Sequence, residues 1–437
     1  MVITDIITRE LFLDYMSFFR TILDYIHIFF DSGFYVLLYL MAFITLGFLL
    51  ISIIVCIFSK SYKEKKFIPK KAPFVTIQIP TRNEIIALRC AERCLNFDYP
   101  KNKFEILIGD DSNDKSVSSQ LIAFAKKYSN VRIIKRKENI GYKPGNLQNM
   151  LQYSKGEILV IFDSDYIPEK DFLRRIITPF IYDKSISVVQ SRWNFYNYDQ
   201  NFVTIMSSTI GYVFHHITLS FLQIFGTTSL CGSAEAVKKK DLISLGGWKV
   251  GSLTEDIEYT LRLQSVGKKI IYLDKLECNG EAPFTAKDFF KQQMRWAYGV
   301  VHSYILDFKK LYLSKNIGLW RKMISSLAGI GYLIAPLITL LFCFGILSFV
   351  THTPEAFDVV KFFKETGFNI LITSGLIVAS IIALVRAKRS KMILKMIVSS
   401  FSVGIIAIYY VDKGIAKCLL NKHMEWFLLK KETDYKK

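Results

Sequence analysis

The sequence predicts an α/β fold in which a mostly parallel sheet domain is joined to membrane-associated helices. Between residues 74 and 284, short apolar runs rich in β-branched residues alternate with helical patterns. Long apolar runs without charged residues lie on both sides of this region. Polar residues directly follow three of the predicted strands, where sheets of this type bind their ligands. Together, these observations predict a membrane protein with a ligand-binding sheet domain.

The composition is that of an integral membrane protein with a sizeable polar domain. The chain has 437 residues, of which 51% are hydrophobic, and it carries a formal charge of +19. Its basic residues cluster beside the apolar runs, which indicates membrane topology and attraction to anionic lipids. A nucleic-acid-binding protein would interleave basic and aromatic residues on the soluble domain, and this domain lacks that bias. We therefore expect a lipid bilayer, and no nucleic acid, among the partners.

The cysteines and histidines form neither a disulfide pattern nor a metal-binding pattern. None of the seven cysteines belongs to a Cys-x-x-Cys pair, and the six histidines lack the spacing of metal ligands. This usage is typical of a reducing compartment. His215 and His216 lie in an aromatic-rich stretch, where we expect packed or interfacial side chains rather than ligands.

Two membrane-associated segments are predicted before the sheet domain. Residues 1–32 are expected to form an amphipathic helix that lies in the membrane interface or packs against other helices, because Asp14, Arg20 and Asp24 disfavour a spanning helix. Residues 33–58 are free of charge and long enough to cross a bilayer. The lysine-rich stretch after them predicts that the next domain is cytosolic.

The sheet domain is predicted to occupy residues 70–285. Strands are expected at residues 75–79, 104–108, 131–134, 158–162 and 187–190. Helices are expected at residues 84–95, 117–128, 144–153 and 170–180. This alternation predicts a mostly parallel sheet with helices on both faces.

The strand at residues 158–162 leads directly into two carboxylates, Asp163 and Asp165. On an extended segment, side chains two residues apart project to one side. A divalent cation, Mg²⁺ or Mn²⁺, relieves the repulsion between such carboxylates, and a nucleotide diphosphate completes its oxygen ligands. Glu84 and Asp111 lie at the ends of two other predicted strands. Taken alone, these acidic residues also fit solvated turns or helix starts.

The remainder of the chain is predicted to return to the membrane. Residues 286–322 are amphipathic and should lie along the cytosolic interface. Spanning helices are expected within residues 323–411, with an external loop at residues 351–367. The tail at residues 412–437 is basic and therefore expected in the cytosol, although a single crossing before it would place it outside. One apolar segment is thus expected to be re-entrant, interfacial or miscounted.

Several ordered motifs resemble those of one enzyme family. They are the paired aspartates at residues 110–111, D-S-D at 163–165, L-T-E-D at 253–256 and Q-Q-M-R-W at 292–296. These resemble the D, D, D, Q-x-x-R-W signature of membrane-integrated glycosyltransferases of family 2, which include cellulose, hyaluronan and glucomannan synthases. V-Q-S-R-W at 189–193 and E-A-P at 281–283 are closest to the cellulose-synthase-like and mannan-synthase-like branch. The resemblance covers residues 74–320 and implies a cytosolic, Rossmann-like GT-A domain in a multi-pass protein of the cell membrane.

The resemblance implies a role for each matched residue. Asp256 matches the catalytic base of inverting members, and Asp163 and Asp165 match the residues that hold the Mg²⁺ or Mn²⁺ ion. The implied donor-binding residues are Glu84, Asp111, Lys143, Asp163 and Arg295. The implied acceptor-binding residues are Gln292, Trp296 and Cys231.

Alternatives remain open at some of these positions. Glu255 competes with Asp256 for the role of base, and Asp256 also fits a helix start. Cys231 equally fits a packing residue. Arg82 stands where some relatives carry an aromatic residue, which leaves the contacts with the nucleotide base open.

The resemblance implies an inverting hexosyltransferase that uses UDP-glucose, UDP-N-acetylglucosamine or GDP-mannose. Its product would be a β-linked polysaccharide, extruded through a channel formed by a small helix bundle or a homo-oligomer. A non-processive synthase that glycosylates diacylglycerol or a polyprenol phosphate is an alternative with the same chemistry. An inactive membrane scaffold or export subunit is an alternative of another class, and it predicts the loss of an acidic motif, whereas all are present.

Overall fold

The computed structural model describes residues 2–352 and 358–431. The chain divides into two compact units. One consists of Met1–Leu50 with Leu333–Ala379, and the other of Ile51–Tyr332 with Ser380–Lys437. The described part of the first unit is largely helical, and the second unit contains the sheet domain.

The first unit contains most of the helix α1 (Val2–Phe58), together with α12 (Ile334–Thr351) and α13 (Val359–Thr373). The sequence predicts two segments where the structure has the single helix α1. The helix continues through Gly33, where a Cβ atom would lie 2.4 Å from the ring of Phe344. Glycine therefore serves close packing on α12 here, rather than ending a helix.

The prediction of an external loop at residues 351–367 is wrong for its second half. The structure begins α13 at Val359, and the side chain of Asp358 caps it by accepting a hydrogen bond from the Lys361 N–H at 3.0 Å. Residues 353–357 of the predicted loop lie outside the described part of the chain. The charged residues from Lys361 onward in this stretch therefore belong to a helix that Asp358 caps.

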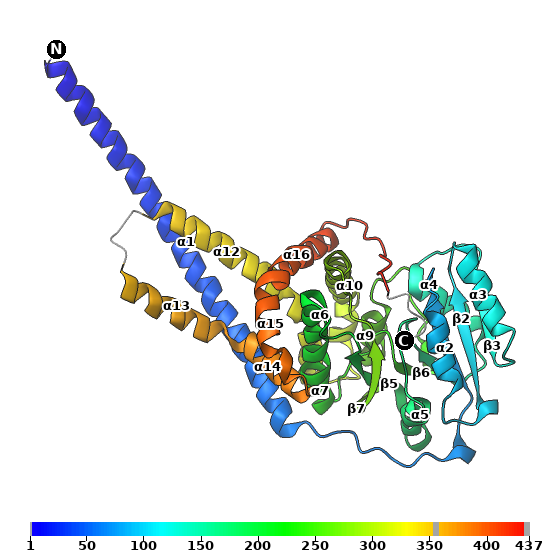
Figure 1. Cartoon of the computed structure of the whole chain (residues 1–437). Helices are drawn as coiled ribbons and strands as arrows, with labels where there is room; N and C mark the ends of the chain where they lie inside the picture. Colours follow the sequence, from blue (N-terminus) through cyan, green and yellow to red (C-terminus); the bar gives the residue numbers. More distant parts are fainter. Residues whose placement is uncertain (1, 353–357, 432–437) are drawn as a thin grey trace. The chain divides into compact units, whose positions relative to one another are not determined.

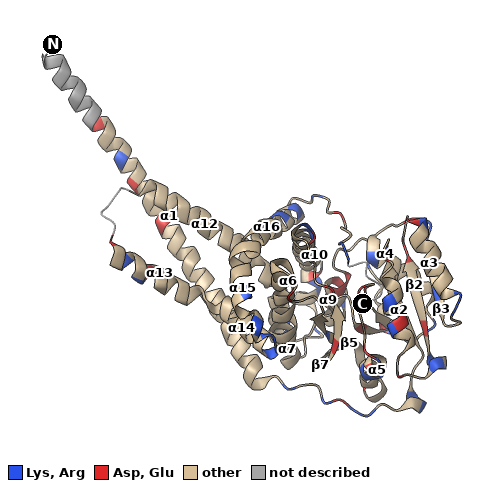
Figure 2. Ribbon diagram, in the orientation of Figure 1, with Lys and Arg blue, Asp and Glu red and all other residues tan. Residues whose placement is uncertain are grey.

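Within the described residues, three helices are long and apolar enough to cross a membrane. They are Asp14–Phe58, Gly331–Thr351 and Ser390–Leu419. A fourth candidate is formed by α13 together with α14 (Gly375–Arg386), which are bent by 50° relative to each other. Charged residues are sparse along α12 and α14 (Figure 2), as expected for segments in contact with lipid.

The second unit is built on a seven-stranded sheet in the order β3-β2-β1-β4-β6-β5-β7. The strands β1 to β4 pair in parallel, β5 pairs in parallel with β7, and β6 runs antiparallel between β4 and β5. The predicted mostly parallel α/β sheet is therefore confirmed. The strands are β1 Val75–Thr81, β2 Phe104–Asp110, β3 Val131–Lys135, β4 Ile158–Ile161, β5 Ile186–Phe195, β6 Glu235–Lys238 and β7 Lys269–Gly280.

All five predicted strands are present, but the sequence does not predict β6 or β7. β6 is only four residues long and has charged residues at both ends, so it lacks an apolar run. Its place in the sheet depends on its pairing with β4 and β5. β7 interrupts its apolar residues with Asp274, Lys275 and Glu277, and this obscures the strand pattern.

Helices cover both faces of the sheet (Figure 1). In β4, Val160 packs in a cluster with α2, α3 and α5, whereas Leu159 and Ile161 pack in another with α4, α8 and α9. This division follows from the alternation of side chains along a strand. The helices are α2 Ala87–Leu95, α3 Lys115–Ala125, α4 Tyr142–Tyr153, α5 Phe172–Tyr182, α8 Lys239–Ser244 and α9 Glu255–Ser265.

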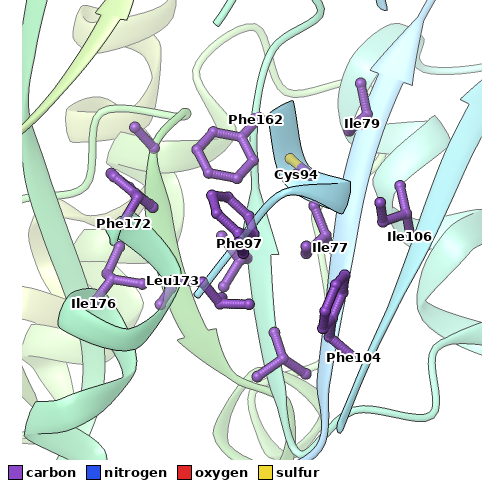
Figure 3. Packing of buried hydrophobic residues seen from close by; sticks show 14 of the residues in the cluster. Ile77, Ile79, Cys94, Phe97, Phe104, Ile106, Phe162, Phe172, Leu173 and Ile176 are labelled. Atoms are coloured by element: carbon purple, nitrogen blue, oxygen red, sulfur yellow. The ribbon is translucent and has the colours of Figure 1, made fainter. Parts of the chain in front are cut away.

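An aromatic cluster anchors the chain immediately before the predicted metal ligands (Figure 3). Phe162 is fully buried between Phe97 and Phe172, at ring-centroid distances of 6.4 Å and 5.2 Å. Burying three phenylalanine side chains stabilises this end of β4 strongly. The backbone that leads into Asp163 is therefore held by the core.

A second group of helices packs beside the sheet. Tyr410 stacks on Phe290 at 4.9 Å, and a Cβ atom at Gly414 would meet the carbonyl oxygen of Met294, so α16 lies close against α10. The predicted amphipathic segment 286–322 divides into α10 and α11. The helices of this group are α6 Phe202–Val213, α7 Leu219–Ile224, α10 Ala286–Leu313, α11 Leu319–Ile330, α15 Ile393–Ser399 and α16 Ile405–Leu419.

Candidate active site

Three of the predicted acidic residues meet at the carboxyl edge of the sheet. Asp163 and Asp165 lie in the turn after β4, and Glu84 lies after the neighbouring strand β1. The Ser164 hydroxyl donates a hydrogen bond to Glu84, which ties the two strand ends together. Burial, together with the nearby carboxylates of Asp165 and Asp163, raises the pKa of Glu84 to about 7. This edge therefore concentrates negative charge.

Each aspartate of the pair is bound by a lysine. The Asp163 carboxylate lies 2.8 Å from the Lys143 ammonium, and the Asp165 carboxylate lies 3.0 Å from that of Lys431. The second oxygen of Asp165 accepts a hydrogen bond from the Glu281 N–H at 2.8 Å. Burial raises the pKa of Asp163, as does Asp165, while Lys143 opposes the rise. The two lysines thus supply positive charge that compensates the pair.

Lys143, at the start of α4, links the aspartate pair to α9. Its ammonium lies 3.0 Å from Glu255 and donates a hydrogen bond to the Gly232 carbonyl at 2.7 Å. Burial disfavours this charge, but Asp163 and Glu255 outweigh that effect and raise the pKa of Lys143. Lys143 is therefore a fixed positive charge within the site.

Asp256 lies beside this network without joining its ion pairs. A Cβ atom at Gly232 would lie 3.4 Å from the Lys143 Nζ atom and 3.5 Å from the Asp256 Oδ2 atom. Burial and the neighbouring Glu255 raise the pKa of Asp256 to about 7. Since Glu255 is engaged with Lys143, the geometry favours Asp256 over Glu255 as the group able to accept a proton.

Cys231, which precedes Gly232, is buried. Its N–H donates to Glu235 at 3.3 Å and to the Gln190 side chain at 2.9 Å. Burial and Asp256 raise the pKa of the Cys231 thiol, so it is neutral. Burial and Asp256 also raise the pKa of Glu235, to about 8.

Asp111 follows β2 and is held by a residue that the sequence analysis missed. The Arg136 guanidinium donates to both Asp111 oxygens, at 2.7 Å and 2.6 Å, and also to the Tyr142 carbonyl at 2.9 Å. Such a two-point contact fixes the carboxylate in orientation as well as position. Arg136 directly follows β3, so the same strand-end rule that selects Asp111 would also have found it.

The three residues of the Q-x-x-R-W motif lie on one face of α10, because residues three and four apart are neighbours on a helix. Gln292 is buried, and its side-chain oxygen has no hydrogen-bond partner within the described residues. The Arg295 guanidinium donates to the Leu253 carbonyl at 3.0 Å, which connects α10 to the start of α9. Burial lowers the pKa of Arg295, although Glu255, Asp256 and Asp163 favour its charge. Trp296 is half-buried.

The segment after α16 turns back over the site (Figure 1). The Trp426 ring lies 4.0 Å from the Arg295 guanidinium and stacks on Tyr142 at 6.0 Å. Five residues further on, Lys431 reaches Asp165. The sequence analysis treats this tail only as a topology signal, and no local pattern in it indicates contact with the sheet domain.

The residues at the carboxyl edge fit a divalent metal ion. Asp163 and Asp165 offer hard oxygen atoms, and both already attract ammonium groups. Within residues 2–352 and 358–431, no cluster of three or more histidine, cysteine or acidic side chains is arranged to hold a metal. A metal here would therefore depend on further oxygen atoms from a ligand, as is usual for Mg²⁺ with phosphates.

Comparisons with known proteins give consistent matches. Residues 72–299 match the family described as glycosyltransferase-like family 2, and residues 232–397 match the cellulose synthase family. The chain is 31% identical over 298 residues to glucomannan 4-beta-mannosyltransferase 2 of Arabidopsis thaliana, covering 65% of this chain and 55% of the relative. Glucomannan 4-beta-mannosyltransferase 9 of the same plant is 30% identical with the same coverage. The chain thus spans about half the length of these curated relatives.

One solved structure aligns over nearly the whole chain. It is the mannosyltransferase PcManGT from Pyrobaculum calidifontis in complex with GDP-Man and Mn²⁺, with a TM-score of 0.60 and 16% identity. The alignment covers 92% of this chain and 100% of the other. At this identity, the similarity shows a shared fold.

Proposed function

Since the chain belongs to the glycosyltransferase-like family 2, we propose that it is a membrane-associated, inverting hexosyltransferase that builds a β-linked polysaccharide from a nucleotide diphosphate sugar. One observation carries the proposal. Lys143 joins the Asp163–Asp165 pair to the start of α9, where Asp256 stands with a raised pKa. The residues that would hold the departing diphosphate thus lie next to Asp256, the candidate base.

The donor would bind at the carboxyl edge of the sheet. Asp163 and Asp165 would hold Mg²⁺ or Mn²⁺, which neutralises charge on a departing diphosphate. Lys143 and Arg295 would offset the remaining phosphate charge. Glu84 and Asp111, fixed at the ends of β1 and β2, would hold the nucleoside. The orientation of Asp111 by Arg136 supports a positioning role at this end.

Asp256 would act as the general base. It would accept the proton of an acceptor hydroxyl as the hydroxyl oxygen attacks the anomeric carbon. The bond from this carbon to the diphosphate oxygen breaks on the opposite face, so an α-linked donor yields a β-linked product. A pKa of about 7 leaves the carboxylate partly unprotonated near neutral pH and still able to take up a proton.

GDP-mannose is the first donor to test. The curated relatives are named glucomannan mannosyltransferases, and the aligned solved structure is described with GDP-Man. UDP-glucose and UDP-N-acetylglucosamine remain the alternatives within the same chemistry. Gln292 and Trp296 would contact the acceptor, whereas Cys231 is better placed to support the Gly232 backbone, since its thiol is buried.

We place the catalytic domain and the described tail on the cytosolic side of a cell membrane. The contact between Lys431 and Asp165 supports placing the tail and the catalytic domain on the same side of the membrane. The packing of α16 on α10 supports Ser390–Leu419 as a helix at the membrane surface, despite its span-like length. Cysteines introduced at Asp98 and Lys422 should react equally with an impermeant reagent in inverted vesicles, and opposite accessibility would refute this topology.

A transfer assay tests the function. The full chain in nanodiscs would be supplied with Mn²⁺ and, in turn, labelled GDP-mannose, UDP-glucose and UDP-N-acetylglucosamine. We expect a high-molecular-weight product that one β-glycanase, matched to the donor sugar, digests. A single labelled lipid would instead establish the glycolipid synthase. Absence of transfer from every donor, with Asp256→Asn indistinguishable from the unaltered chain, would overturn the catalytic proposal and favour an inactive scaffold.

A further inference from the structure

A cavity that is separate from the site around Asp163 lies in the sheet-containing unit. It has a volume of about 570 Å³, within the range of about 300–1,000 Å³ that is usual for small-ligand sites. Its lining residues come from the start of the link after α1, from β5, α6, the short helix Phe214–Thr218 and β7, and from the end of α14 and the residues that follow it. None of the candidate catalytic, donor-binding or acceptor-binding residues belongs to this lining.

The lining has an excess of positive charge. Two of the lining side chains are acidic, Asp274 and Glu277. Five are basic: Arg192, Lys275, Arg386, Lys388 and Arg389. Both acidic groups already have partners. Asp274 accepts hydrogen bonds from the Ser61 hydroxyl and the Tyr62 N–H, and Glu277 lies 3.8 Å from Arg192. Neither acidic side chain of the lining is therefore paired with Arg386 or Arg389.

Two arginines of the lining, Arg386 at the end of α14 and Arg389 three residues after it, are held close to the cavity. The Nε atoms of Arg386 and Arg389 are buried and lack a hydrogen-bond partner in the described part of the chain. The Arg389 guanidinium stacks 4.0 Å above the Tyr198 ring, which orients it. Burial and the nearby Arg192 lower the pKa of His216 to about 2, so this imidazole is neutral. The effect of Arg192 on this pKa is what a cluster of positive charge produces. Guanidinium groups match the geometry of phosphate oxygens, and the contact with Tyr198 holds that of Arg389 in place.

The cavity lies where two apolar helices end. Arg386 is the last residue of α14, and Ser61 follows the end of α1 at Phe58. Just before these ends, Val55 of α1 packs in one cluster with Ala383 and Leu384 of α14. Figure 2 shows basic residues gathered at this end of α14. Basic residues at the ends of apolar helices lie at the depth of lipid headgroups.

We propose that this cavity binds a phosphate group at the membrane surface, held by Arg386 and Arg389. An anionic phospholipid headgroup and a soluble phosphate ester share this chemistry. The inference does not depend on the glycosyltransferase proposal, because its residues and its ligand are different.

Binding of phosphatidylglycerol to the full chain in detergent tests the proposal, with retained lipid measured by native mass spectrometry. Arg386→Gln should weaken binding about tenfold, as expected for the loss of one charge-assisted hydrogen bond. Lys391→Gln is the matched control, because it removes one positive charge from the same segment but does not line the cavity. Arg389→Gln provides a second variant, and thermal unfolding curves identify any variant that fails to fold.

Competition with inorganic phosphate identifies the source of the ligand. Displacement of the lipid by millimolar phosphate would assign the cavity to soluble phosphate esters, and resistance would assign it to the lipid headgroup. Unchanged lipid binding by folded Arg386→Gln and Arg389→Gln would overturn the proposal, as would an equal loss in Lys391→Gln.

Discussion

At the scale of single residues, the contrast between Asp256 and Glu255 decides which carboxylate is available. The two are adjacent at the start of α9, but only Glu255 is within ion-pair distance of Lys143, at 3.0 Å. Asp256 is half-buried next to Gly232 and keeps a raised pKa. Neighbours in sequence thus acquire different chemistry from their environment.

Replacing Asp256 tests this assignment. Asp256→Asn keeps the shape of the side chain but removes its ability to accept a proton. We expect the rate of sugar transfer to fall about 10²- to 10⁴-fold with little change in donor affinity. Asp98→Asn, at an exposed carboxylate, serves as the control and should retain full activity. A loss smaller than tenfold would exclude Asp256 as the base.

The pH dependence of transfer provides a second test at this scale. The pKa of Asp256 is about 7, and a base must be unprotonated to act, so kcat/KM should fall as the pH drops below about 7. Glu255→Gln removes the like charge that raises this pKa and should move the acidic limb to lower pH. A limb that stays in place in Glu255→Gln would assign it to another group.

At the scale of elements, the site depends on how closely α9 and α10 approach each other. Thr254, immediately before α9, shares a hydrogen bond of 3.1 Å with Ser303 of α10. Arg295 of α10 donates to the Leu253 carbonyl on the same side of α9. These contacts couple the Q-x-x-R-W motif to the position of Asp256.

A small substitution in α10 should disturb this coupling. A Cβ atom at Gly299 would lie 2.5 Å from Thr254 Cγ2, so Gly299→Ala forces the two helices apart. We expect a loss of about 1–3 kcal/mol in stability, as for overpacked cores, together with lower activity. Gly318→Ala is the matched control, since no atom of the described residues lies within 4 Å of its added atom. Equal thermal unfolding temperatures for the two variants would contradict this view of the contact.

At the scale of the whole chain, the site joins residues that are far apart in sequence. The carboxyl edge of β1 and β4 supplies Glu84, Asp163 and Asp165, and the final described residue, Lys431, lies against Asp165. The side chain of Lys431 is only 18% exposed, and Asp165 and Glu84 raise its pKa despite burial. The C-terminal segment is thus part of the site.

This arrangement predicts competition between Lys431 and a divalent metal. The ammonium occupies one oxygen of Asp165, so Lys431→Gln should strengthen Mn²⁺ binding, up to about tenfold, in the absence of donor. Electron paramagnetic resonance of free Mn²⁺ measures the effect. Lys430→Gln is the control, because the Lys430 ammonium lies 6.0 Å from the Phe284 ring centroid, whereas that of Lys431 contacts Asp165. Identical Mn²⁺ affinity in both variants would argue against competition.

Much of the fold and part of the site are predictable from local pattern. Apolar runs with alternating partners predict five of the seven strands, and parallel strand ends predict the meeting of Glu84, Asp163 and Asp165. The sequence analysis did not identify Arg136 as a site residue, although the same rule applies to it. It did not predict β6 or the contact of Lys431 for a different reason, since each is placed by partners distant in sequence.

The sequence alone therefore determined the α/β class, the apolar segments and the acidic residues at the strand ends, because these follow from periodicity and local chemistry. Only the tertiary structure decided that Glu255 rather than Asp256 is paired with Lys143, that α1 is one helix, and that the basic tail contacts Asp165. Ion pairing and burial depend on which distant side chains come into contact, and a linear pattern does not encode those distances.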